Sequence, residues 1–238
     1  MNGLAGSDVF QYSHLVYKDD LNRNGVVISL NREAYFAFQD TILLSQYHEL
    51  KMESQRRQED IFALCPTIRK RSQYINIENL KMGIGFELHL KARLLKSNYI
   101  IHNINSHDIT FKGLSKEQKR RPILKDEYFN IDGYRFNGQR NVLVGLMEQS
   151  INFDLLLNKE EYNRCLNLTD DMRSIIDGYR KLRNRIHLPG DVIDMKNLNR
   201  DNLMEILVEF INKEIVQTTN SLASECGLEK VRLKELII

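Results

Sequence analysis

Apolar side chains recur at steps of three and four residues along several segments of this chain, which is the spacing of one face of an α-helix. The pattern is clearest between Leu168 and Gly190. One stripe in this segment is expected to face a core: Met172, Ile175, Ile176, Tyr179, Leu182 and Ile186. The stripe predicts a single amphipathic helix with one buried face.

Both ends of this helix are marked in the sequence. Thr169 stands where an N-cap is expected, and Asp170 and Asp171 place negative charge in the first turn. Pro189 disfavours helical backbone at the residue before it, and a glycine follows. The helix should therefore begin after Thr169 and end at about His187.

Similar periodicity predicts long helices elsewhere in the chain, over 31–64, 76–102, 141–157 and 199–221. The dipeptide Cys65-Pro66 is expected to end the first of these, and Asn76 to cap the second. The last is apolar on almost every side, which indicates burial in a bundle or in an interface between subunits. A short apolar run predicts a strand over 26–30, and the tail over 225–238 is expected to add one short helix.

Residues 105–140 have a different character. The segments 107–111 and 128–136 resemble short strands, the second with an Asp-Gly hairpin turn at 132–133, and a polar, basic stretch separates them. The whole pattern predicts a mainly α fold, a four- to five-helix up-and-down bundle with a small β-hairpin insertion. We expect a single domain over 1–238, with its helical core at about 32–222.

Composition limits the classes of function. The formal net charge is only +2, so any binding of nucleic acid must come from a local patch and not from a global field. No apolar run approaches the roughly 18 residues of a membrane span, and the N-terminus lacks the apolar core of a signal peptide. Three widely spaced cysteines, never in a CxxC pair, indicate reduced thiols without a zinc site. These features predict a soluble cytoplasmic protein.

The helix over 76–102 contains signs of close packing. Gly83 and Gly85 would each cost about 1 kcal/mol against alanine in a helix interior, so a close neighbour is expected there. Glu87 and Lys91 are a favourable i, i+4 pair. His89 has no second ligand at metal spacing in the sequence, so a structural role is expected for it.

The helix between Leu168 and Gly190 also carries a polar stripe, at intervals of three and four residues: Arg173, Asp177, Arg180, Asn184 and His187. Arg183 lies one turn before His187, at the border between the polar and apolar faces. A histidine at a helix end beside two arginines and an amide is a candidate site for acid–base chemistry.

The segment Leu182-Arg-Asn-Arg-Ile-His-Leu188 resembles the motif of the HEPN superfamily, an arginine followed after four to six residues by a histidine. The earlier segment Gly85-Phe-Glu-Leu-His-Leu-Lys-Ala-Arg-Leu-Leu95 is similar to the second helix of that family. The likeness covers roughly residues 32–222, interrupted by the 105–140 insertion. Counted from Arg183, three residues precede His187; counted from Arg180, six do, but Lys181 then follows where an amide or acid is usual. The motif arginine is therefore Arg183 or Arg180.

The resemblance implies a metal-independent endoribonuclease that needs no cofactor and acts as a toxin or in anti-phage defence. It implies two protomers that present two such helices to one RNA strand, and an antitoxin or defence protein as a further partner. RNA supplies its own nucleophile, the 2′-hydroxyl, so the protein need only move protons and stabilise charge. His187 suits proton transfer, Arg183 suits the scissile phosphate, and Asn184 and Arg180 would support them.

Three interpretations other than catalysis remain open at the level of sequence. Arg180 or Arg183 would pair with Asp177 or with acids on a neighbouring helix, and His187 would cap the helix, in a purely structural arrangement. A HEPN-like module without catalysis would bind RNA, a nucleotide or a protein partner. An unrelated helical structural protein is the third class.

Overall fold

The computed structural model describes residues 19–57, 61–101, 120–130, 151–184 and 200–237. This part of the chain is mainly helical, and its only β pairing is an isolated bridge between Tyr99 and Leu124. A helical bundle is thereby confirmed, whereas the described residues contain no β-hairpin.

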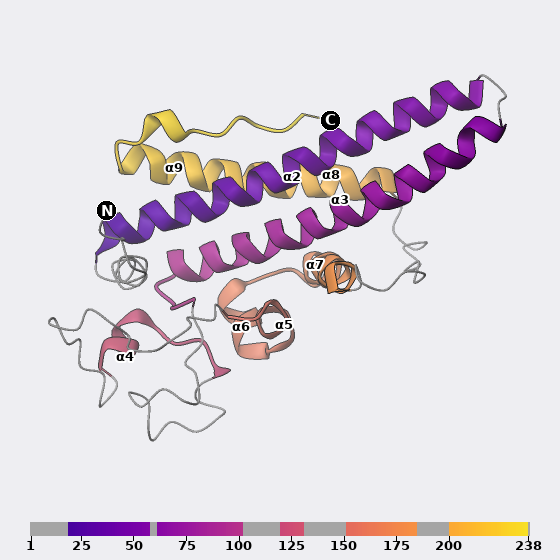
Figure 1. Ribbon diagram of the computed structural model, residues 1–238. Helices are drawn as coiled ribbons and strands as arrows, with labels where there is room; N and C mark the ends of the chain where they lie inside the picture. Colours follow the sequence, from indigo (N-terminus) through magenta and orange to yellow (C-terminus); the bar gives the residue numbers. More distant parts are fainter. Residues whose placement is uncertain (1–18, 58–60, 102–119, 131–150, 185–199, 238) are drawn as a thin grey trace, which may run out of the picture.

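Two long helices dominate the molecule (Figure 1). α2 (Asp20–Arg57) and α3 (Ile61–Lys96) run antiparallel, side by side. An ion pair at 2.5 Å between Lys81 and Asp40 joins them. Phe38 of α2 meets Phe86 of α3 edge-on in the core, with ring centroids 4.8 Å apart. Edge-to-face packing of this kind adds about 0.5–1.5 kcal/mol to the area that the rings bury.

The remaining helices pack around this pair. A C-terminal helical rod lies against both α2 and α3, and it consists of α8 (Arg200–Phe210), the π-helix η3 (Ile211–Gln217) and α9 (Thr218–Glu225). α7 (Asp170–Asn184) packs on α3 and contacts α5 (Phe153–Asn158), which in turn contacts α6 (Glu160–Leu166). The short helices α4 (Lys125–Asn130) and η4 (Glu229–Val231) complete the described elements.

One large core joins these elements. Side chains from α2, α3, α5, α6, α7 and the C-terminal rod form a continuous buried cluster, in which Phe38, Phe86, Leu90, Leu156 and Ile176 are fully buried. Burial of each such side chain stabilises the fold by roughly 1.5–3 kcal/mol. α7 is thus fixed on α3 by its apolar face, and its polar face is left at the edge of the core.

The two glycines of α3 are confirmed as points of close packing. A Cβ at Gly85 would lie 2.8 Å from the Phe38 ring, and one at Gly83 would lie 2.9 Å from Cβ of Arg183. Real Cβ atoms do not approach neighbours so closely. α2 can therefore approach α3 at Gly85, and α7 can approach it at Gly83, only because these positions lack a side chain. Gly83 therefore sets the distance between α3 and the arginine-bearing turn of α7.

The strand expected over 26–30 is wrong, since these residues lie inside α2. Val27 and Ile28 are buried in a second cluster with Leu95 and Ile100, so the apolar run is the inner side of a helix. Asp19 accepts a hydrogen bond at 2.7 Å from the backbone N–H of Asn22, which is N-cap geometry. A short apolar run does not by itself distinguish a strand from a buried helix segment.

The expected bounds of the long helices also need correction. α2 begins at Asp20 and not at Asn31, and it ends at Arg57. α3 begins at Ile61 and contains Pro66, which was expected to separate two helices, and it ends at Lys96 and not near His102. In its early part α3 is helical on both sides of the proline, and Asn76 lies within the helix instead of capping it.

The insertion and the helix after it differ from expectation as well. Residues 128–130 are the end of α4 and not the start of a strand, while 107–111 and 131–136 lie outside the described residues. The helix expected over 141–157 does not extend unbroken to its end, because Asn152 caps the separate helix α5. Its side-chain oxygen accepts a hydrogen bond at 3.0 Å from the N–H of Asp154. Residues 141–150 are outside the described part.

The C-terminal tail is held to the rod by two asparagines. Asn220 accepts a hydrogen bond from the backbone N–H of Leu233 at 2.7 Å and donates one to its carbonyl at 2.9 Å. Asn212 contacts Leu236 in the same reciprocal way, at 2.8 and 2.9 Å. We call these contacts the asparagine clamps. They satisfy backbone groups of an extended segment in the manner of a sheet edge.

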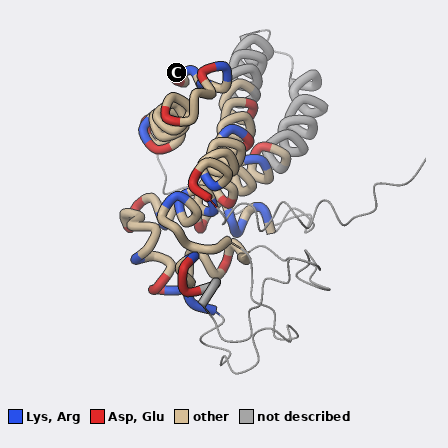
Figure 2. The backbone as a smooth tube through the Cα atoms, turned by 90° about the vertical axis from the view of Figure 1, so that its left-hand side faces the viewer, with Lys and Arg blue, Asp and Glu red and all other residues tan. Residues whose placement is uncertain are grey.

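Charge is mixed over the described helices. Figure 2 shows the positions of Lys and Arg interspersed with those of Asp and Glu along the backbone, in keeping with the near-zero formal charge. Within the described ranges, no helix combines the length and the hydrophobicity that crossing a bilayer requires.

Candidate functional site: the arginines of α7

The start of α7 agrees with the sequence. Thr169 accepts a hydrogen bond at 3.3 Å from the backbone N–H of Met172, which confirms it as the N-cap. Ile175, Ile176 and Tyr179 are buried on the predicted apolar face. The described part of α7 ends at Asn184, whose side chain is exposed. His187 and the predicted helix end lie outside the described residues.

Arg183 is held against α3. Its guanidinium forms an ion pair with Glu87, and it lies over the ring of Phe153 with 5.9 Å between the guanidinium carbon and the ring centroid. Glu87 also binds Lys91 at 2.5 Å, which confirms the expected i, i+4 pair. The Arg183 side chain keeps 30% of its surface exposed. It is therefore oriented by the protein on one side and open to solvent on another.

Arg180 is more enclosed, with 12% of its side chain exposed. It binds Asp154 of α5 at 2.8 Å and Asp177 of its own helix at 2.7 Å, and Lys181 binds Asp177 from the other side at 2.7 Å. Burial alone would raise the pKa of the Asp177 carboxyl. Hydrogen bonds from Lys181 and Arg180, together with their charges, outweigh that effect and hold this pKa below its ordinary value.

The two arginines, with Lys91 and Lys181, outnumber the carboxylates of Glu87, Asp154 and Asp177 by one charge. We call these seven residues the α7 charge cluster. Its small positive excess lies at the end of α7 that carries Asn184. Such a cluster can hold an anion where a cation retains donors beyond its carboxylate partner; Lys181 is 56% exposed, and Arg183 is the more exposed of the two arginines.

Sequence reasoning placed Arg180 and Arg183 on one helix correctly, and the pairing expected in the structural alternative, with Asp177 or with acids on a neighbouring helix, is found as Arg180–Asp177 and Arg183–Glu87. Glu87 was expected to pair with Lys91 and was not singled out as the partner of Arg183, from which it is separated by 96 residues of sequence. Asp154 was not singled out at all. The available signal for Glu87 was its place two residues after Gly85, in the segment that resembles the second HEPN helix.

His89 of α3 has the structural setting that was expected for it. It is 1% exposed, and its Nδ1 lies 3.1 Å from Oδ1 of Asn31. Burial, followed by the positive charge of Arg93, lowers its pKa to about 3, so the ring is neutral at physiological pH. The described residues include no group of three His, Cys, Asp or Glu side chains suited to a metal ion.

Comparison with known proteins adds no relative. The chain matches no protein-family model, and neither curated proteins nor solved structures contain a significant match to it.

Proposed function

We propose that this protein is a metal-independent endoribonuclease of HEPN type, which acts as a toxin or an anti-phage defence effector. Arg183 binds the scissile phosphate, His187 transfers the proton, and Asn184 and Arg180 support them. The observation that carries the proposal is the setting of Arg183, which is fixed by Glu87 and by close contact with Gly83 yet remains 30% exposed beside Asn184.

This setting favours phosphate binding for a physical reason. A guanidinium has five N–H donors, and the ion pair with Glu87 engages its Nη1 atom. A cation already positioned by its neighbours loses little side-chain entropy when it binds an anion, and it can stabilise the extra charge of the pentavalent transition state. The attacking group is the 2′-hydroxyl of the RNA itself, which a histidine near neutrality can deprotonate.

The mechanism includes a homodimer. One copy of a short Arg/His motif offers a single proton carrier, whereas cleavage requires a base for the 2′-hydroxyl and an acid for the leaving 5′-oxygen. Two protomers would supply one histidine for each task. We therefore expect a dimer at micromolar concentration in light scattering, and a strictly monomeric protein would argue strongly against this mechanism.

A second candidate function is a non-catalytic module that binds RNA, a nucleotide or a protein partner. It is favoured by a specific observation, namely that Arg180 and Arg183 both have carboxylate partners in the free protein. In that case the α7 charge cluster is chiefly structural, and binding would be insensitive to His187→Ala.

The deciding experiment is incubation of the purified protein with total RNA in EDTA. Wild type should cleave, and His187→Ala should lose activity by roughly 10²- to 10⁴-fold, the usual contribution of general acid–base catalysis. Arg183→Lys should also lose activity, because lysine keeps the charge but not the bidentate fork. Arg180→Ala separates the two candidate motif arginines.

The matched control is Arg173→Ala, which removes an exposed arginine from the same helix outside the charge cluster. It should cleave like wild type, and circular dichroism should show the same helicity for every variant. If wild type, His187→Ala and Arg183→Lys cleave RNA equally, or not at all, the hypothesis that α7 is catalytic is refuted. Retained RNA binding without cleavage would then support the second candidate, and loss of cleavage on chelation would refute a metal-independent reaction.

A further inference from the structure

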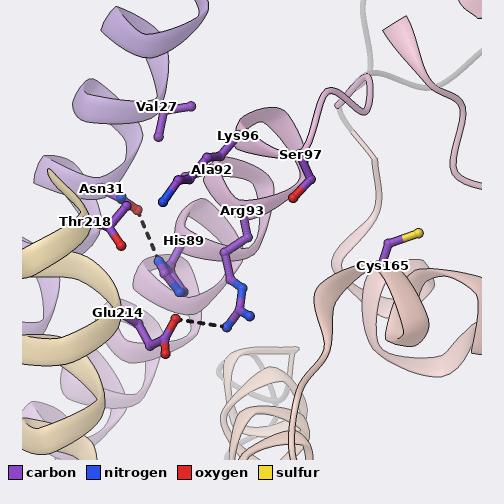
Figure 3. A pocket seen from close by; sticks show the side chains of 10 residues that line it. All are labelled: Val27, Asn31, His89, Ala92, Arg93, Lys96, Ser97, Cys165, Glu214 and Thr218. Atoms are coloured by element: carbon purple, nitrogen blue, oxygen red, sulfur yellow. Dashed lines mark hydrogen bonds and ion pairs between the residues drawn. The ribbon is translucent and has the colours of Figure 1, made fainter. Parts of the chain in front are cut away.

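A polar cavity lies on the other side of α3 from the arginines of α7. It has a volume of about 290 Å³, is open to solvent on one side, and is lined by α2, α3 and the C-terminal rod, with Cys165 at one edge (Figure 3). Its polar lining includes Asn31, His89, Arg93, Lys96, Ser97, Glu214 and Thr218. None of these residues belongs to the α7 charge cluster, so the cavity is a separate feature.

The wall formed by the C-terminal rod has unusual backbone geometry. The seven residues of η3 are a π-helix inserted between α8 and α9, and Glu214 lies within it. Thr218, the next lining residue, directly follows it. π-helical turns are rare, and they are frequent at functional sites. Here the wider turn is located where the rod faces the cavity.

A buried polar atom in this wall lacks a partner. The Nε2 atom of His89 has no hydrogen-bond partner among the described residues, whereas Nδ1 contacts Asn31. Asn31 is itself only 1% exposed. A buried polar group without a partner costs about 1–3 kcal/mol, so such groups in native proteins are usually satisfied by water or by a ligand. His89 and Asn31 thus form a polar floor that can bind a hydroxyl or an amide.

The charges of the wall favour an anion. Arg93 and Glu214 form an ion pair at 3.3 Å across the cavity wall. Lys96 follows Arg93 by three residues, on the same side of α3, and it lines the same space. Figure 3 shows His89, Arg93 and Lys96 in succession along α3, with Glu214 on the facing helix. The carboxylate offsets one of the two cations, and one positive charge remains.

We propose that this cavity binds a small organic anion, a carboxylate or a phosphate monoester. The acid group of this ligand lies between Arg93 and Lys96, and a hydroxyl or amide group of the same ligand reaches Asn31, His89 and Thr218. A cavity of about 290 Å³ is at the lower end of the range for ligand pockets, which limits the ligand to a few carbon atoms. This inference does not depend on the ribonuclease proposal.

The test uses the full-length chain and defined probes in a thermal-shift and calorimetry series. Glycerol 3-phosphate, inorganic phosphate and succinate represent the two acid chemistries, while glycerol and ethanolamine are the neutral and cationic controls at equal ionic strength. At a hundredfold excess over Kd, an anion that fits should raise Tm by roughly 5–10 °C. Preference between glycerol 3-phosphate and succinate identifies the acid group.

Two variants connect binding to the cavity. Lys96→Ala should weaken the binding of the preferred anion at least tenfold. Lys213→Ala is the matched control, because it removes an exposed lysine of η3 that does not line the cavity. Thr218→Val replaces the hydroxyl with a methyl group of similar volume and should weaken organic anions more than inorganic phosphate.

A spectroscopic signal reports on the floor directly. The ¹⁵N resonance of His89 Nε2, assigned by comparison with His89→Gln, should shift when the preferred anion is added to wild type. The proposal is overturned if no anion probe binds at 10 mM, or if Lys96→Ala and Lys213→Ala weaken binding equally. Binding that leaves the His89 resonance unchanged would place the anion elsewhere and would also overturn it.

Discussion

The interior of this protein contains a histidine that cannot carry its usual charge. His89 is surrounded by Asn31 on α2, Arg93 on α3, the Phe210 ring at 5.3 Å on α8, and Glu214 on η3 in the same cavity. A charge in this setting would lose its hydration and face the Arg93 cation. The neutral ring is therefore part of the folded state and not a surface feature that titrates freely.

This setting predicts an acid-sensitive stability. An unfolded histidine takes up a proton near pH 6.5, whereas the pKa of folded His89 is about 3, so the unfolded state binds more protons between these values. Stability is therefore lost as pH falls through this window, by about 1.4 kcal/mol per pH unit. In urea unfolding, the free energy of unfolding of wild type should fall by roughly 2 kcal/mol more than that of His89→Gln between pH 7 and pH 5. Equal losses would contradict the buried neutral ring.

Gly83 allows the close approach of α3 and α7, so a larger residue at this position should lower the stability of the protein. Gly83→Ala would place a Cβ 2.9 Å from Cβ of Arg183 and 3.2 Å from the carbonyl oxygen of Tyr179. Because neither atom is the free end of a side chain, we expect a loss of about 1–3 kcal/mol in the free energy of unfolding.

Gly178→Ala is the matched control in α7, since no atom lies within 4 Å of the added Cβ. It should stabilise the protein by about 0.5–1 kcal/mol, because alanine is the better helix former. Both values can be measured by urea titration. A stabilising Gly83→Ala would show that α3 and α7 are not in the close contact described.

At the level of elements, the N-terminus of α7 predicts a measurable cap. Thr169→Ala removes the hydrogen bond to the N–H of Met172 and should cost about 1 kcal/mol of stability. The control is Ser174→Ala, an exposed position inside the same helix, which should be neutral or slightly stabilising. Similar effects of the two changes in thermal unfolding would show that Thr169 is not a cap.

The elements also show which features a sequence can predict. The start and the buried face of α7 followed from Thr169 and the spacing of Ile175, Ile176 and Tyr179, because these are local signals. The start of α2 was missed because the run that contains Val27 and Ile28 is equally compatible with a strand. The π-helix η3 was also missed, since a segment that is apolar on almost every side gives no periodicity over seven residues that would distinguish a wider turn from an ordinary one.

In the candidate site, too, the features set by local periodicity could be predicted, and those set by packing between helices could not. That Arg180 and Arg183 lie on one amphipathic helix follows from periodicity, and the sequence was sufficient to predict it. Asp177, a partner of Arg180, lies on α7 itself and was anticipated, whereas Glu87 and Asp154 come from other helices, and only the packing of α7 on α3 and α5 determines them. The cavity beside His89 depends on three elements at once, so no local pattern predicted it.

For the molecule as a whole, the asparagine clamps predict that the tail is part of the folded unit. Asn212→Ala combined with Asn220→Ala should release it, which would speed hydrogen exchange at the amides of Leu233 and Leu236. Lys234→Ala with Glu235→Ala is the control, because these side chains are exposed. Exchange at the two leucine amides that is unchanged in the asparagine variant would show that the leucine side chains alone hold the tail.

The clamps have a consequence for how this chain can change over time. Each asparagine forms hydrogen bonds with a backbone N–H and C=O, and every residue type except proline has both groups. Residues 234 and 235, which lie between the two leucines, can therefore be substituted without changing the path of the tail. A proline at 233 or 236 would remove the N–H that donates to the asparagine, so we expect proline to be disfavoured at both positions in addition to any loss of the leucine side chain from the core.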